Sequence, residues 1–256
     1  MPAENTTRYF IELSFDGTAY HGWQIQPNAL TVQQTLEEAF FTILRQKTGF
    51  TGAGRTDTGV HALSYMAHFD ADLSGSGLAP AGLIYKVNCI LPPDIAIKTI
   101  RPVQPDAHAR FSALWRNYEY RITLHKDPFL VGRAWRIPHP PDLDMIRQAT
   151  QILFEYSDYE CFSKSNTQVN NYRCRIMEAS WVEENSLIIF RIKADRFLRN
   201  MVRAIVGTLM NVGTGKINLT DLRAIIESKN RSNAGYSVPG YGLYFTGAGY
   251  PDEVYC

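Results

Sequence analysis

Hydrophobic and polar residues follow two different periods along this 256-residue chain, one typical of strands and one of amphipathic helices. Residues 8–15 alternate and are rich in aromatic and β-branched side chains, which predicts a strand. Thr31 and Gln34 form a capping-box pattern, and the apolar residues that follow predict a helix ending at Gly49. The same criteria predict further elements in this half: a strand over 63–69, a helix over 80–89 and a strand over 95–100.

The second half of the chain shows the same mixture of patterns. A long alternating strand is expected over 115–124, and residues 172–183 with 187–194 predict a hairpin that turns at 183–185. A strong apolar face at helical spacing predicts a helix over 197–212. Shorter elements complete this half: helices over 142–154 and 219–228, and a strand over 243–247.

The order of these elements favours an α+β fold, because hairpin signals are antiparallel and a doubly wound sheet would need parallel strands. A proline-bounded segment at 102–105 divides the chain into halves of similar layout. We therefore predict two similar subdomains with mainly antiparallel sheets, residues 1–105 and 106–256. Ser/Gly-rich residues 73–77 predict a linker, and residues 163–171 predict a polar loop.

Composition narrows the class of protein without identifying a function. A hydrophobic fraction of 45% and a charged fraction of 20% are ordinary globular values, and this length can bury a sizeable core. The formal net charge of +1 excludes a global polycation, so a nucleic-acid binder would need clustered positive charge. Four separated cysteines, with no signal peptide and no membrane-length apolar run, predict a reduced, cytoplasmic protein.

Residues 52–62 combine the features of a reactive loop. Three glycines surround Asp57, and Arg55 lies two residues before it. Glycine lets a loop adopt unusual backbone angles and lets a ligand approach closely. A D-T-G sequence alone is best explained as a turn aspartate, but the arginine and the glycines favour a site. Because a nearby guanidinium stabilises a charged carboxylate, we expect Asp57 to be ionised and to act as a nucleophile or an electrostatic stabiliser.

Three other kinds of site are disfavoured by the sequence. The segment 213–216, GTGK, lacks the first glycine and the final Ser/Thr of a phosphate-binding loop. The six histidines show no metal-ligand spacing and do not pair with cysteines, so we predict no metal site. An aspartic protease uses two carboxylates. Because no second D-T/S-G occurs, that interpretation would require an active site shared across a dimer axis.

Positive charge gathers in two clusters that suit RNA binding. One combines Arg110, Arg116 and Arg121 with neighbouring Trp and Tyr residues, and the other lies between Arg191 and Arg203. Basic groups interleaved with aromatic rings suit phosphate contacts and base stacking, although a single exposed arginine is usually a solvated surface residue. Arg203 differs because it falls among the apolar residues of its helix and needs a partner, for which Asp57 is a candidate.

Together these motifs resemble the tRNA pseudouridine synthase A family over most of the chain. Residues 54–62, GRTDTGVHA, match that family's signature, which usually reads G-R-T-D-A-G-V-H-A. The resemblance implies the pseudouridine synthase fold, in which two subdomains join around a central cleft. Further blocks match in the same order: 15–18, 22–26, 88–95, 108–110, 116–120 and 197–203.

The resemblance implies an isomerase that converts uridine to pseudouridine in the anticodon stem-loop of tRNA. Asp57 would be the catalytic nucleophile, and Arg55 would pair with it and help to displace the target nucleotide. Tyr118 would stack on the uracil and is a candidate to take the proton from its C5. Arg203 would form an ion pair with Asp57, and Leu243 would pack against the base.

The same resemblance implies that His108, Arg110 and Phe111 line the RNA path. It also implies a cytoplasmic homodimer that needs no cofactor and no metal and that binds RNA across its subunits. The chain departs from the family at Ala107, where an aromatic residue is usual, and at Gly240, where alanine is common. These departures affect the contacts expected with the RNA and within the pocket.

The chemistry agrees with a single essential carboxylate. Pseudouridylation breaks the N1–C1′ bond and joins C5 to C1′, and the uracil stays bound, so the second carboxylate of a glycosidase is not required. Asp57 could attack C1′, trap an oxocarbenium-like centre or abstract a sugar proton, and the sequence leaves these routes open. We expect Asp57, Tyr118 and Arg203 to converge in one cleft between the halves. The alternative is a non-catalytic RNA-binding module that uses the same basic clusters.

Overall fold

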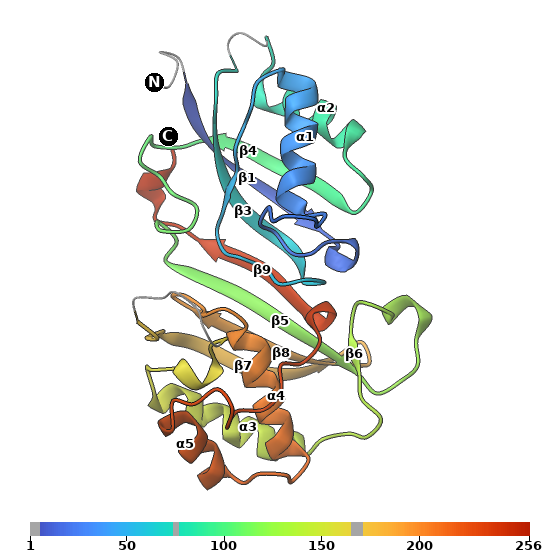
Figure 1. Ribbon diagram of the computed structural model, residues 1–256, viewed down its shortest axis with the longest axis vertical. Helices are drawn as coiled ribbons and strands as arrows, with labels where there is room; N and C mark the ends of the chain where they lie inside the picture. The colour runs from blue at the N-terminus through green and yellow to red at the C-terminus, as the bar shows by residue number, and fades with distance from the viewer. Residues whose placement is uncertain (1–5, 74–76, 165–170) are drawn as a thin grey trace. The chain divides into compact units, whose positions relative to one another are not determined.

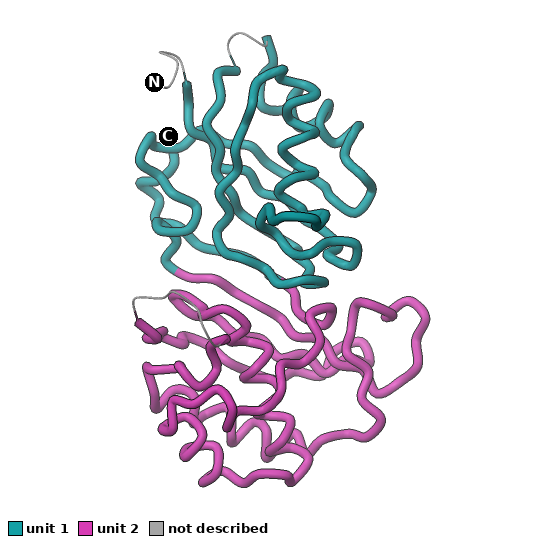
Figure 2. The backbone as a smooth tube through the Cα atoms, viewed as in Figure 1, with its two compact units in different colours: residues 1–114, 245–256 teal, residues 115–244 magenta. Residues whose placement is uncertain are grey.

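The computed structural model of the chain describes residues 6–73, 77–164 and 171–256. The chain forms two compact units, one made of Met1–Leu114 with Phe245–Cys256 and the other of Trp115–Tyr244 (Figure 2). The predicted boundary between residues 105 and 106 therefore lies inside the first unit. Most of the predicted linker at 73–77 and of the predicted loop at 163–171 lies outside the described residues.

The first unit is built on the antiparallel strands β4–β1–β3 (Figure 1). The side chains of β1 alternate between two packed faces, as its sequence pattern predicts. On one face Phe40 lies against Phe69 of β3, with 5.2 Å between the ring centroids. On the other, Phe10 packs into a cluster that includes Val254 near the C-terminus. The elements of this unit are β1 (Thr7–Phe15), α1 (Val32–Leu44), β2 (Thr51–Gly52), β3 (His61–Ala71), α2 (Pro80–Ile90), β4 (Ile95–Pro102) and most of β9 (Leu243–Gly249).

Helix α1 begins as the sequence predicts but ends earlier. Thr31 Oγ1 accepts a hydrogen bond from the Gln34 backbone N–H at 3.3 Å, which confirms the predicted N-cap. The Gln34 side chain bonds to Glu38 rather than back to the cap. The helix stops at Leu44, and the predicted end at Gly49 is wrong, because Arg45 adopts a left-handed backbone with φ of 57°.

The second unit has the strand order β5–β8–β7, in which neighbouring strands are antiparallel, and a short β6 pairs with β5 in parallel. The predicted hairpin is confirmed. It turns at Asn185 and Ser186, whose positive φ angles of 50° and 63° suit a tight two-residue turn, so the turn predicted at 183–185 is slightly misplaced. The strands of this unit are β5 (Trp115–Thr123), β6 (Trp135–Arg136), β7 (Ile176–Glu184) and β8 (Leu187–Ala194).

Three helices accompany this sheet: α3 (Leu143–Ile152), α4 (Met201–Gly213) and α5 (Leu219–Glu227) (Figure 1). Almost every residue of α4 is buried, which its apolar sequence predicts. The predicted start of this helix at residue 197 is wrong, because Asn200 has a left-handed φ of 68° and helical geometry begins only after it. Arg203 therefore lies in the first turn of α4.

The described elements confirm an α+β fold with mainly antiparallel pairing. The arrangement of two similar subdomains around a cleft stays a prediction. Among the described helices, none has the length and apolarity that crossing a membrane requires. All four cysteines carry free thiols, two of them buried and two exposed.

Candidate active site

The Asp57 loop is fixed at both ends to the same strand. At its start, Ala53 donates its backbone N–H to the Met66 carbonyl oxygen at 2.8 Å and is almost fully buried. The Tyr65 hydroxyl donates to the Gly54 carbonyl oxygen. At its end the loop runs directly into β3 at His61. A short loop held in this way positions its side chains on a rigid element, which is what a reactive group requires.

Two glycines outside the loop fit closely against its backbone. A Cβ atom at Gly17 would lie 2.0 Å from the Val60 carbonyl oxygen, and one at Gly22 would lie 2.2 Å from the Thr56 carbonyl oxygen. Gly22 also has a φ of 85°, which strongly favours glycine. These contacts explain why the blocks at 15–18 and 22–26 carry glycine, and no local sequence pattern indicates them.

Asp57 is partly buried, and its carbonyl oxygen accepts a hydrogen bond from the Val60 N–H at 3.2 Å, which closes a turn in the loop. Arg55 is exposed. The pairing expected between the Arg55 and Asp57 side chains stays a prediction. The Thr56 hydroxyl oxygen is buried and has no hydrogen-bond partner within the described part of the chain.

His61 connects the loop to the segment that carries Gly17. Its ring is 2% exposed, and its Nδ1 lies 3.0 Å from the Gly17 N and 3.1 Å from Asp16 Oδ1. The Nδ1 atom carries either a proton or a lone pair, so it cannot both accept from the Gly17 N–H and donate to Asp16 Oδ1. Because Asp16 Oδ1 already accepts from the Thr18 N–H and hydroxyl, we assign Nδ1 as the acceptor of the Gly17 N–H. The sequence signal for this contact was the histidine of the GVHA tetrapeptide.

Tyr118, Arg203 and Leu243 belong to the second unit. Residues 238–243 form a short segment that contacts Arg203 and Tyr120 and ends at Leu243. Arg203 Nε donates to the Val238 carbonyl oxygen at 2.7 Å, which orients the guanidinium. The Tyr120 hydroxyl donates to the next carbonyl oxygen, that of Pro239, at 2.9 Å. Tyr118 is two residues from Tyr120 and therefore points to the same face of β5. Leu243 follows at the end of the segment and is buried.

Within the second unit, the segment 238–243 binds Arg203 and leads to Leu243, and Tyr118 shares a strand face with Tyr120, which binds the same segment. Tyr118 is 8% exposed and makes an edge-on contact with Phe197, with ring centroids 5.1 Å apart. Close packing of Gly242 against the Tyr120 ring leaves no room for a Cβ atom there. Asp57 belongs to the first unit. Its convergence with Tyr118 and Arg203 stays a prediction.

The predicted RNA-contacting residues form an exposed turn in the first unit. Phe111 is 75% exposed, its ring centroid lies 4.3 Å from that of His108, and the Arg110 guanidinium lies over it at 5.6 Å. Burial, together with the neighbouring Arg8 and Arg110, lowers the pKa of His108. The turn therefore combines a cation, an exposed aromatic ring and a neutral imidazole, a combination that suits contacts with phosphate and with bases.

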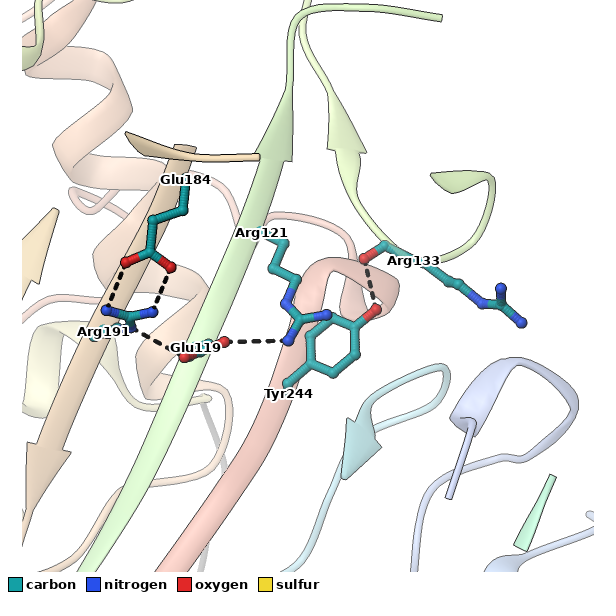
Figure 3. Close-up of polar contacts among 6 residues, drawn as sticks. All are labelled: Glu119, Arg121, Arg133, Glu184, Arg191 and Tyr244. Atoms are coloured by element: carbon teal, nitrogen blue, oxygen red, sulfur yellow. Dashed lines mark hydrogen bonds and ion pairs between the residues drawn. The ribbon is translucent and has the colours of Figure 1, made fainter. Parts of the chain in front are cut away.

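Much of the positive charge expected to bind RNA is instead paired within the second unit. Arg191 lies between Glu184 and Glu119, with nitrogen–oxygen distances of 2.9 and 3.0 Å (Figure 3). Arg121 pairs with the other oxygen of Glu119 and stacks on Tyr244 at 3.9 Å. Register explains the pairing, because Glu119 lies directly opposite Arg191 across β5 and β8.

Two further basic residues of the predicted clusters also have partners. The Arg116 side chain is buried and donates to the Asp195 carbonyl oxygen at 2.7 Å, so it supports the backbone rather than a ligand. Lys193 pairs with Glu178 and lies over the Trp115 ring. The prediction of two broad basic patches is therefore wrong in these places. Among the described residues, no group of three or more His, Cys, Asp or Glu side chains could hold a metal ion.

Comparison with known proteins relates the sequence of this chain to a family. The family model described as "tRNA pseudouridine synthase" matches residues 149–251. Proteins named tRNA pseudouridine synthase A from Bacteroides fragilis and Porphyromonas gingivalis are each 49% identical to this chain, and one from Parabacteroides distasonis is 46% identical. Each alignment covers 97% of this chain and 98–99% of the relative. With this identity over nearly its whole length, the chain belongs to the tRNA pseudouridine synthase A family of isomerases.

Proposed function

We propose that this enzyme isomerises uridine to pseudouridine in the anticodon stem-loop of tRNA, with Asp57 as the catalytic nucleophile. The observation that carries this proposal is the construction of the Asp57 loop. Its backbone is pinned to β3 and packed against Gly17 and Gly22, so a single carboxylate is presented from a rigid support. The names of the relatives supply the reaction and the class of RNA.

In the proposed reaction the N1–C1′ bond of the target uridine breaks and C5 joins C1′. A proton leaves C5 and N1 gains one, so the reaction is an isomerisation with no net transfer of atoms. Asp57 attacks C1′, traps the oxocarbenium-like centre or abstracts a sugar proton, and each route needs the carboxylate ionised. Tyr118 stacks on the uracil and takes the C5 proton.

The other site residues orient this chemistry. Arg203, whose Nε is committed to the Val238 carbonyl oxygen, forms the ion pair with Asp57 in the proposed assembly. Leu243 packs against the base. Extruding a stacked base costs a few kcal/mol, and the exposed Arg55 side chain offsets that cost by occupying the vacated space.

RNA binding is assigned to the turn formed by His108, Arg110 and Phe111, whose cation and exposed ring suit backbone and base contacts. A homodimer that works in the cytoplasm and needs no cofactor belongs to the same proposal. Ala107 is buried against Phe10 and its neighbours, so this departure from the family pattern affects packing beneath the turn.

The test of the proposed function is the variant Asp57→Asn, which keeps the size of the side chain and removes its charge. We expect the wild type to form pseudouridine in an unmodified tRNA transcript, mapped by carbodiimide chemistry, and Asp57→Asn to form none. The variant should still fold and bind the transcript. Asp252→Asn, an exposed aspartate of the same unit, is the matched control and should keep full activity.

Two outcomes would refute the proposal. Substantial product from Asp57→Asn would exclude the aspartate as the nucleophile. A wild-type protein that binds tRNA but forms no pseudouridine would favour the alternative, a non-catalytic RNA-binding module.

A further inference from the structure

Tyr236 is a large aromatic residue that is 54% exposed, although its backbone is fixed by several contacts. It lies in the second unit, in the loop between α5 and β9. An aromatic side chain on a loop that becomes ordered only when it binds a ligand adds an entropic cost to binding. At Tyr236 the backbone is already ordered by its neighbours, and this cost is reduced before any ligand binds.

Contacts on both sides of Tyr236 hold this backbone. A Cβ atom at Gly207 of α4 would lie 1.9 Å from the Tyr236 carbonyl oxygen, so the loop packs directly on the helix. The preceding Gly235 donates its N–H to the buried Thr208 hydroxyl at 2.8 Å. The following Ser237 hydroxyl oxygen lies 2.8 Å from an Arg231 guanidinium nitrogen.

The Tyr236 ring is supported by Trp135 from a different element. The two ring centroids lie 6.0 Å apart with an interplanar angle of 82°. Trp135 belongs to β6 and makes a second edge contact, 6.3 Å from the buried Tyr120. An edge contact of this kind covers at most one face of Tyr236, so the ring keeps a face for another aromatic group.

The Trp135–Tyr236 pair adjoins the residues assigned to the reaction. Tyr236 precedes Val238, whose carbonyl oxygen binds Arg203, by two residues. Tyr120 supports both Trp135 and the Pro239 carbonyl oxygen. Burial and the nearby Tyr241 and Tyr236 raise the pKa of Tyr120, while Arg203 acts to lower it.

We propose that the Trp135–Tyr236 pair is a stacking site for an unpaired nucleobase of the RNA substrate, next to the uridine that reacts. The assignment rests on the proposed function, because it uses the role proposed there for Arg203. A base that loses its neighbour when the target nucleotide leaves the stack needs a new aromatic surface. An exposed tyrosine on a fixed backbone provides one, and stacking of this kind tolerates any base.

The test compares Tyr236→Ala with Tyr236→Phe. The phenylalanine variant keeps the ring and the alanine variant removes it. The dissociation constant for an unmodified anticodon stem-loop transcript is measured in the Asp57→Asn background, where no turnover occurs. We expect Tyr236→Ala to weaken binding about tenfold and Tyr236→Phe to bind like its parent. Tyr85→Ala, which removes an exposed tyrosine of the first unit, should have no effect.

Abasic transcripts identify the stacked base. Each nucleotide that flanks the target is replaced in turn by one without a base, and the effect of Tyr236→Ala is measured again. At one flanking position, the losses of binding free energy caused by the abasic nucleotide and by Tyr236→Ala should not add. The base that stacks on the Tyr236 ring is already missing from that transcript. Additive losses at every position, or equal weakening by Tyr236→Ala and Tyr236→Phe, would overturn the stacking site.

Tyr236→Ala and Tyr236→Phe are then made in the protein that keeps Asp57 and are assayed for pseudouridine. This assay makes a failure of the proposed function distinguishable from a failure of the stacking site. A wild type that forms no pseudouridine overturns the proposed function, whereas the binding measurements still decide whether Tyr236 stacks on RNA. Loss of binding by Tyr236→Ala, with product formation reduced mainly through KM, supports the stacking site.

Discussion

Gly17 and Gly22 allow the backbone to pack closely against the Asp57 loop, because neither residue has a side chain. Each brings its Cα within reach of a loop carbonyl oxygen, where a Cβ atom would overlap at 2.0 or 2.2 Å. The glycines within the loop could be recognised from the sequence because they surround a carboxylate. Those outside it could not, since a contact between segments distant along the chain leaves no local pattern.

Gly22→Ala should damage both stability and activity. The new methyl group would overlap the Thr56 carbonyl oxygen, and the backbone would be strained at a φ of 85°. We expect the free energy of unfolding to fall by about 2–4 kcal/mol and kcat/KM to fall by at least about tenfold, because a small displacement of a reacting group is costly. Urea unfolding and the tRNA assay measure the two effects.

Alanine substitutions at two other glycines separate the cost of backbone strain from the cost of steric overlap. Gly215 has a φ of 70° with no atom within 4 Å of a Cβ position, so Gly215→Ala measures the strain alone, about 1 kcal/mol. Gly49 has neither feature, and Gly49→Ala should be neutral or slightly stabilising. If Gly22→Ala were no worse than Gly215→Ala, close packing against the loop would not be what positions Asp57.

At the scale of elements, the sequence predicted the kinds of strands and helices better than their ends. Apolar periodicity located α4, but its first residue depends on Asn200, which is left-handed without being glycine. Arg45 ends α1 in the same way. Such residues carry a backbone cost that tertiary packing must offset, so a propensity-based prediction places the helix end at the next glycine instead.

A histidine ties β3 to the turn that is proposed to contact RNA. His68 is 7% exposed, and its Nδ1 accepts the Ala109 N–H at 3.1 Å. Burial, then the neighbouring His108 and Arg8, lower its pKa to about 4, while Asp70 acts in the opposite direction. The folded protein therefore keeps this ring neutral well below the ordinary histidine pKa of about 6.5.

This neutral ring makes stability depend on pH. Between pH about 6.5 and 4 the unfolded chain binds a proton at His68 that the folded chain does not, so the free energy of unfolding falls as the pH falls. His68→Asn offers an oxygen acceptor and does not titrate. We expect it to lose less stability than the wild type between pH 7 and pH 5 in urea unfolding. His139→Asn, at an exposed histidine, should behave like the wild type, and an unchanged pH dependence in His68→Asn would contradict the assignment.

At the scale of the whole molecule, 26 basic residues nearly balance 25 acidic ones, and pairing decides which basic groups can meet a polyanion. The sequence placed Arg121 and Arg191 in two basic clusters that suit RNA binding. Their pairing with Glu119 and Glu184 depends on strand register, which a linear reading does not provide (Figure 3). The grouping of His108, Arg110 and Phe111 does not depend on strand register, because these residues lie within four positions of the chain.

The salt dependence of tRNA binding tests separately whether Arg110 and Arg191 contact the RNA. A side chain that displaces counterions from the RNA contributes to the slope of log K against log salt, whereas one already paired with carboxylates does not. We expect Arg110→Ala to weaken binding and to reduce the slope by about 1. Arg191→Ala, which removes an arginine held by two carboxylates, should leave the slope unchanged. Binding measured at several salt concentrations on one unmodified transcript makes the comparison. Equal slopes for Arg110→Ala and the wild type would exclude the turn from the RNA path, and a lower slope for Arg191→Ala would mean that RNA displaces its carboxylates.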